Sequence, residues 1–269
     1  MSAKKTTEPV GVRSALMAAC VEMERLLGRL NDSHGRVAEE VHQVRKLGKR
    51  LRGALAMCGE SKQHIRSLAV IGRMMGGARD ATVRVKTWES LGSGKAAEGS
   101  IDAAIGALLD LEASAANRVP PQAVVNWSLA AIGQLVNRLA ERSEEEMEDA
   151  AVEGVTRLER RLRKRLKRAL RTGCSDDYHA CRKLVKAWVG GTSLVLPGIE
   201  LPGAKVAERL ADKLGDENDL EVLACWMTRC GFTPAIAEAA WKLLRQRQDR
   251  IRRRSDSLIR KELLPVIRK

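Results

Sequence analysis

The sequence is very poor in two aromatic residues, with a single tyrosine and a single phenylalanine among 269 positions. Proteins that grip single-stranded nucleic acid usually stack bases on exposed aromatic rings, so this shortage argues against base readout. Five tryptophans remain, and each lies within an apolar pattern that favours a core or core-edge position. They are Trp88, Trp127, Trp188, Trp226 and Trp241. Nucleic acid is therefore a disfavoured partner.

Close cysteine pairs and long apolar runs are also missing. The six cysteines form no CxxC pair, and the chain is too long to need disulfide staples, so we expect reduced and mostly buried thiols. The N-terminal segment contains no apolar stretch typical of a signal peptide, and no run approaches the ~18 residues of a membrane span. These features predict a cytoplasmic protein without a membrane partner.

Alternation with a period of two, which would indicate strands, is hard to find. Apolar residues instead recur every three or four positions, as at Val37, Val41, Val44 and Leu47, which predicts an all-α fold. Turn signals divide the pattern into about ten segments, which is typical of helical bundles. They lie at 31–33, 59–61, 76–77, 92–94, 120–121, 173–176, 196–203 and 231–234.

Positive charge exceeds negative charge by 48 Lys and Arg to 34 Asp and Glu, a net charge of +14. Such a balance favours an anionic partner. Residues 141–149 are acidic, whereas 157–171 contain nine basic residues and one acid, so we place a boundary near residue 150. Leucines at every fourth position make 157–171 an amphipathic helix with a broad cationic face, and 245–261 is similar.

An internal repeat with a spacing of about 138 residues contains the most informative motif. HQVRKLGK begins at His42 and HACRKLVK begins at His179, so both copies read H-x-x-R-K-x-x-K. Each copy then reaches an Asp-x-x-Val, at Asp80 and at Asp219, and each closes on a tryptophan. Residues at i, i+3, i+4 and i+7 share one face of a helix, so each motif predicts a cationic row. Like charges at this spacing repel by roughly 0.2–0.5 kcal/mol per pair, a cost that a bound polyanion would offset.

These motifs resemble the CHAD family, the conserved histidine α-helical domain, over approximately residues 10–265. The resemblance implies two four-helix bundles related by a pseudo-two-fold axis, with a basic cleft between them that binds inorganic polyphosphate. The first half would cover residues 10–148 and the second 149–268, together forming one CHAD domain. We expect a non-enzymatic protein in the cytoplasm, with recruitment to polyphosphate granules, storage or regulation as the candidate purposes of binding. Sulfate or phosphate is expected to occupy the same site in crystals.

The residues expected to bind polyphosphate come from the two motifs and from the basic segments beside them. Carried over residue by residue, the resemblance points to His42, Arg45, Lys46, Lys49, Arg50, Arg52, His179, Arg182, Lys183 and Lys186. Flanking candidates are Arg66, Arg73, Arg161, Lys164, Arg165 and Arg168. The second copy departs from the family pattern, because Trp188, Val189 and Gly190 follow where relatives often have a further arginine and an aromatic residue. His34 and His64 lack the motif and are interpreted as surface or structural residues.

Asp80 and Asp219 each follow a glycine-containing break, at 76–77 and at Gly215. We therefore expect them to cap helix starts and to hold an arginine in place, rather than to act as catalytic or metal ligands. No cofactor and no metal are expected, because arginines and lysines beside the histidines would repel a cation. The alternatives are a phosphoanhydride-processing enzyme or its accessory subunit, and an architectural nucleic-acid binder that uses the basic helices. The sequence contains no Gly-rich phosphate loop and no HExxH or DxD cluster to support the enzyme. Protein partners and oligomeric state are not predicted.

Overall fold

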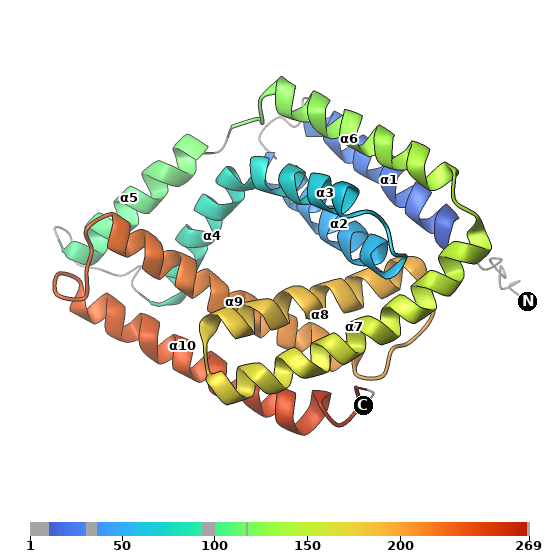
Figure 1. Ribbon diagram of the computed structural model, residues 1–269. Coiled ribbons are helices and arrows are strands. Elements are labelled where there is room, and N and C mark those ends of the chain that lie inside the picture. Colours follow the sequence, from blue (N-terminus) through green and yellow to red (C-terminus); the bar gives the residue numbers. More distant parts are fainter. Residues whose placement is uncertain (1–10, 31–36, 93–99, 117, 268–269) are drawn as a thin grey trace, which may run out of the picture.

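A computed structural model of the chain describes residues 11–30, 37–92, 100–116 and 118–267, and it is helical throughout (Figure 1). Within these ranges it contains ten α-helices, one π-helical turn and no strand, which confirms the all-α prediction. The helices are α1 (Val12–Arg29), α2 (Val37–Met57), α3 (Lys62–Met74), α4 (Gly76–Ser90), α5 (Ile101–Ala116), α6 (Gln122–Ala140), α7 (Glu144–Thr172), α8 (Ser175–Val195), α9 (Ala204–Arg229) and α10 (Glu238–Leu258). The π-helical turn is Ile259–Leu263.

Most helix boundaries fall at the predicted turn signals. Ser61 and Ser143 accept hydrogen bonds from the backbone amides of the first turns of α3 and α7, as serine N-caps do. Gly173 ends α7 in the left-handed conformation, with φ of 62°, which glycine adopts without steric cost. The signals at 31–33 and 93–94, together with His34, lie outside the described residues.

The hydrophobic interior consists of two clusters that differ in size. The larger cluster draws on α1, α2, α3, α6, α7, α8, the first half of α9 and the C-terminal turn. The smaller one joins α4 and α5 to the second half of α9 and to α10. Both clusters therefore take helices from each side of residue 148, and α9 contributes to both. The division into halves at 10–148 and 149–268 stays a prediction.

Helices α2 and α8 cross with their backbones almost in contact, near the centre of Figure 1. A Cβ atom on Gly53 would lie 2.6 Å from the carbonyl oxygen of Ala187, and one on Gly191 would lie 2.7 Å from the carbonyl carbon of Gly53. Side chains at these two positions would push the helices apart. The glycines thus allow the helices that carry the two histidine motifs to pack closely.

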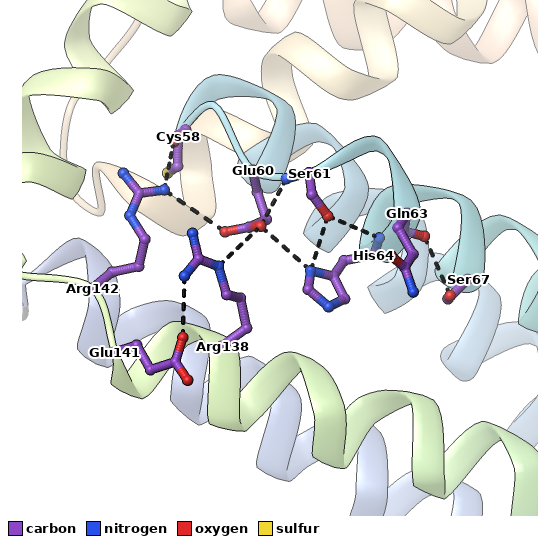
Figure 2. Close-up of polar contacts among 9 residues, drawn as sticks. All are labelled: Cys58, Glu60, Ser61, Gln63, His64, Ser67, Arg138, Glu141 and Arg142. Carbon is purple, nitrogen blue, oxygen red and sulfur yellow. Dashed lines mark hydrogen bonds and ion pairs between the residues drawn. The ribbon is translucent and has the colours of Figure 1, made fainter.

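A buried carboxylate fixes the C-terminal end of α2 (Figure 2). The Glu60 side chain is 2% exposed, and its Oε1 accepts a 2.7 Å hydrogen bond from the Ser61 amide. It also pairs with His64 at 3.3 Å and with Arg138 and Arg142 at 3.7 Å each. The amide bond and His64 keep the pKa of Glu60 below its usual value despite burial, which raises it. This network ties the α2–α3 turn to the end of α6 and to the α6–α7 turn, and it gives His64 a structural role.

The predictions for tryptophan, cysteine and membrane segments have mixed outcomes. Trp88, Trp188 and Trp226 are buried and Trp241 is partly buried, but Trp127 on α6 is 42% exposed, so its core assignment is wrong. All six cysteines are unpaired, and Cys20, Cys58 and Cys181 are buried, whereas Cys174 and Cys225 are exposed. No described helix combines the length and the apolar character needed to span a bilayer.

Candidate functional site: a basic cleft between α2, α4 and α8

The cationic rows of α2 and α8 meet at a hollow of about 560 Å³, called the main cleft here. Its walls are formed by α2, α4, α8 and α9. Predicted site residues that line it are His42, Arg45, Lys46, Lys49, Arg50, Arg182 and Lys186. The close crossing at Gly53 and Gly191 accounts for this convergence, because it holds the two rows against one another across a short gap.

A second hollow of about 230 Å³, called the side pocket here, adjoins the main cleft between α2, α3 and α4. Arg45 and Lys49 line both hollows, so the two form one continuous basic surface, called the basic cleft here. Arg52 from α2 and Arg73 from α3 extend the positive charge into the side pocket, and Asp80 lies there as well. The structure therefore brings nine predicted residues together.

The remaining predicted residues lie elsewhere. His179 lines a different hollow with Glu217, Asn218 and Glu221, and not the main cleft. Lys183 and Arg66 are exposed and line neither hollow of the basic cleft. The α7 candidates Arg161, Lys164, Arg165 and Arg168 are also exposed and line a separate surface hollow whose described walls belong to α7 alone. Two of them, Arg165 and Arg168, pair with Asp177 at the start of α8, at 3.8 and 2.9 Å.

Each histidine motif is linked to the helix that carries its aspartate. Arg79 Nε donates a 3.1 Å hydrogen bond to His42 Nδ1, and Arg45 Nη2 pairs with Asp80 Oδ1 at 3.4 Å. In the second copy, His179 is hydrogen-bonded to Asn218, and the Asp219 carboxylate attracts Arg182 electrostatically. Because His42 Nδ1 accepts from Arg79, the ring proton of neutral His42 is on Nε2 and remains available to a ligand.

The predicted capping role of Asp80 and Asp219 is wrong. Helix α9 begins at Ala204 and runs unbroken through Gly215, so Asp219 lies well inside it. Helix α4 begins at Gly76, which places Asp80 in the second turn, and its N-cap makes no side-chain hydrogen bond. A single helical glycine costs only about 1 kcal/mol, and packing against α8 and α10 overrides that cost in α9. The other expected role, holding an arginine, agrees with the structure, because Asp80 pairs with Arg45 and Asp219 attracts Arg182 electrostatically.

Burial and mutual repulsion weaken the affinity of the cleft cations for protons. The pKa of Lys49 falls to about 8, first through desolvation and then through Arg45, Arg182, Arg79 and Lys186. Burial also lowers the pKa values of Arg45, Arg182 and Lys186. The pKa of His42 is lowered by burial and by Arg79, which favours the neutral ring at pH 7. Positive charge is therefore concentrated here at an electrostatic cost.

Several guanidinium N–H groups in the cleft have no acceptor among the described residues. They are Nε and Nη1 of Arg45, Nε of Arg52 and Nε of Arg182, and all four are inaccessible to bulk water. Buried polar groups in proteins are normally hydrogen-bonded, and an unpaired one costs roughly 1–3 kcal/mol. The same three arginines line the main cleft or the side pocket, and guanidinium groups there suit the oxygens of an anion.

Sequence reasoning missed two features of the cleft. Arg79 from α4 lines the main cleft, although only its neighbour Asp80 was singled out. The second repeat has Asn218 at the corresponding position, so a search for shared residues passes over this arginine. Glu208 and Asp212 from α9 also line the cleft and give one wall a negative character. Among described residues, no cluster of three potential metal ligands occurs.

Comparison with known proteins places the chain in a family. The CHAD domain profile matches residues 23–228, which is more than half of the chain. The chain belongs to the CHAD family. Its fold is similar to that of the crystal structure of the CHAD domain from the plant Ricinus communis, with a TM-score of 0.51 and 19% identity, covering 100% of this chain and 94% of that one. No match was found among curated proteins.

The CHAD match is narrower than the predicted span of 10–265, but it includes both histidine motifs and both aspartates. The second motif's departure from the CHAD pattern at Trp188, Val189 and Gly190 has a packing explanation. Trp188 is fully buried. A Cβ on Gly190 would lie 3.0 Å from Arg50 Cγ, so glycine leaves room for that cleft arginine.

Proposed function

We propose that this CHAD protein binds inorganic polyphosphate, or a similarly dense polyanion, in the main cleft and side pocket without chemically changing it. The observation that carries the proposal is the set of buried arginine N–H groups on α2 and α8 that have no described acceptor. The arginines that bear these groups line the main cleft and the side pocket. The main cleft is large enough for several phosphate units and is lined by seven predicted basic residues. The family membership supports this ligand class, because the motif pattern resembles polyphosphate-binding CHAD domains.

The proposed mechanism is electrostatic. A phosphate chain lies across the α2–α8 crossing, with Arg45 and Arg182 donating charge-assisted hydrogen bonds from opposite sides. Lys49 and Lys186 add positive charge between them, and His42 donates from Nε2. Arg52 and Arg73 in the side pocket continue the track, whereas Glu208 and Asp212 repel the chain from the α9 wall. In the cell, this binding would recruit the protein to cytoplasmic polyphosphate granules.

The test is a titration of the protein with polyphosphates of graded length, with duplex DNA, ATP and sulfate in parallel. Longer chains should bind more tightly until both hollows are filled, and affinity should fall steeply between ~50 and ~500 mM salt through counterion release. Affinity that does not change with salt contradicts the mechanism. Displacement of polyphosphate by DNA at equal phosphate concentration would favour architectural nucleic-acid binding instead.

Processing of phosphoanhydrides by the chain itself is the alternative that needs its own experiment. Such chemistry normally requires carboxylates that hold a divalent metal beside a positioned base. Incubation of the protein with polyphosphate and Mg²⁺ or Mn²⁺ should leave the chain-length distribution unchanged on a gel. Shortening that depends on the protein would establish an enzyme and overturn the non-catalytic proposal.

A further inference from the structure

Lys49 occupies a distinctive position in the cleft. It lines both the main cleft and the side pocket, and its side chain still reaches solvent. The amine is thus open to small molecules that enter either hollow. Lys46, one turn earlier on α2, lines only the main cleft.

The charged groups that lower the pKa of Lys49 are all cations, although Glu208 and Asp212 also line the main cleft, on its α9 wall. Arg45 from the same helix, Arg79 from α4, and Arg182 and Lys186 from α8 all repel its proton. Arg52 and Arg73 line the side pocket, where the acid is Asp80, and that carboxylate pairs with Arg45. Lys186 differs, because Asp212 and Asp219 offset part of the repulsion that it feels. In the described part of the chain Lys49 forms no ion pair.

Two consequences follow for the chemistry of this amine. With a pKa of about 8, a sizeable fraction of Lys49 is the neutral, nucleophilic amine near neutral pH, whereas an ordinary lysine is almost wholly protonated. Arg45 and Arg182 line the main cleft together with Lys49, and guanidinium groups suit a phosphate. A reagent that carries a phosphate next to an electrophilic carbon would therefore be held with that carbon beside the amine.

We propose that Lys49 is a modification site for acyl phosphates, which transfer their acyl group to its amine. The phosphate group binds to Arg45 and Arg182, and the neutral Nζ attacks the carbonyl carbon. A C–N bond forms, the bond between that carbon and the phosphate oxygen breaks, and the phosphate leaves with the electron pair. Nζ loses one proton, which passes to the phosphate, so the products are an uncharged amide and inorganic phosphate.

This inference rests on the proposed function only in that the cleft binds phosphate groups. Acylation removes a cation from the centre of the basic surface, where both hollows meet. Modified protein should therefore bind polyphosphate more weakly, and bound polyphosphate should shield Lys49. The metabolic supply of acyl phosphates would in this way regulate polyphosphate binding.

The experiment is incubation of the full chain with acetyl phosphate at pH 7.5, followed by peptide mass spectrometry of the initial rates. Lys49 should be acetylated at least about tenfold faster than Lys46 on the same helix or Lys183 outside the cleft. This tenfold ratio is smaller than the ratio of neutral amine fractions, because an amine with a lower pKa is also a weaker nucleophile. An uncharged acetylating reagent, N-acetoxysuccinimide, should show a smaller preference, because it gains nothing from the arginines. Replacement Arg182→Gln should slow labelling of Lys49.

Equal rates at Lys49, Lys46 and Lys183 in the wild-type chain would overturn the site, and this comparison needs no variant. An unchanged rate at Lys49 in R182Q would contradict the role of the neighbouring cations. The two proposals can fail separately. Selective labelling of Lys49 in a chain that does not bind polyphosphate would support the modification site and contradict the proposed function. Tight polyphosphate binding without selective labelling would support the proposed function and contradict the modification site.

Discussion

The basic cleft and the basic face of α7 contain similar residues but differ in what surrounds them. On α7, arginines and lysines project from a single helix into solvent, and Arg165 and Arg168 already pair with Asp177. In the cleft, α2, α4 and α8 press their cations together, and four guanidinium N–H groups have no described acceptor. Charge density alone therefore does not distinguish a site. Convergence and unpaired buried donors do, because both carry a cost that a ligand relieves.

The largest expected difference comes from removing four charges from each surface. Replacing Arg45, Lys49, Arg182 and Lys186 by alanine should weaken polyphosphate binding by at least about 100-fold near 0.15 M salt, since each loss removes a charge-assisted contact. The matched control replaces Arg161, Lys164, Lys167 and Arg171 on α7, with the same two arginines and two lysines. This control variant should bind polyphosphate less than about threefold more weakly than the wild-type protein. Fluorescence titration and circular dichroism of both variants measure affinity and helicity.

A similar loss of affinity in both variants would mean that net charge, rather than the cleft, governs binding. A large loss confined to the α7 variant would move the site to that helix.

The helix crossing gives the next largest effect. Gly191→Ala should destabilise the protein by roughly 1–3 kcal/mol, because the added methyl meets the backbone of Gly53 and Ala54. It should also weaken polyphosphate binding by separating the two rows. Gly133→Ala on α6 is the control, since no atom lies within 4 Å of an added Cβ there. This substitution should raise the free energy of unfolding by about 0.5–1 kcal/mol. Chemical denaturation measures both changes, and an undisturbed G191A would show that the crossing tolerates a side chain.

The pH dependence of binding separates the two surfaces further. A bound polyanion stabilises protonated Lys49 and raises its pKa above the value of about 8 in the free protein. Affinity should therefore be high below pH 8 and should fall by up to about tenfold as pH rises from 7 to 9. Lys49→Arg should flatten this dependence, because arginine stays protonated. A wild-type profile that is flat over this range would contradict the assignment.

The two histidines provide the smallest and most discriminating comparison. His42→Ala should weaken polyphosphate binding about fivefold, because the loss of one hydrogen bond costs roughly 1 kcal/mol. His179→Ala should change affinity less than about twofold, because His179 lines another hollow and is bonded to Asn218. Isothermal titration of both variants at constant salt decides the matter. Equal losses would show that the ligand reaches both motifs.

The sequence predicts the all-α fold and most helix boundaries, because helical periodicity and turn residues are local signals. Helical spacing also places the four motif residues of α2 correctly on one face, and all four line the basic cleft together with Arg50 and Arg52. Whether the second motif's histidine lines the basic cleft depends on residues from neighbouring helices. Asn218 stands where α4 has Arg79, and α9 adds Glu217 and Glu221 beside His179.

Tertiary packing decides the rest of the site and is not visible locally. Gly215 looks like a break in the sequence, but α9 continues through it, so Asp219 is no cap. The importance of Gly53 and Gly191 appears only when α2 and α8 are seen in contact. The basic face of α7 has the strongest charge pattern in the chain, yet its described neighbours do not enclose it.

A crystal structure of the protein with a defined short polyphosphate tests the central claim most directly. Phosphate density should lie across the α2–α8 crossing, within hydrogen-bond distance of Arg45 and Arg182 and extending toward Arg52. Density along α7, or an empty cleft in a protein that binds polyphosphate in the same buffer, would contradict the account.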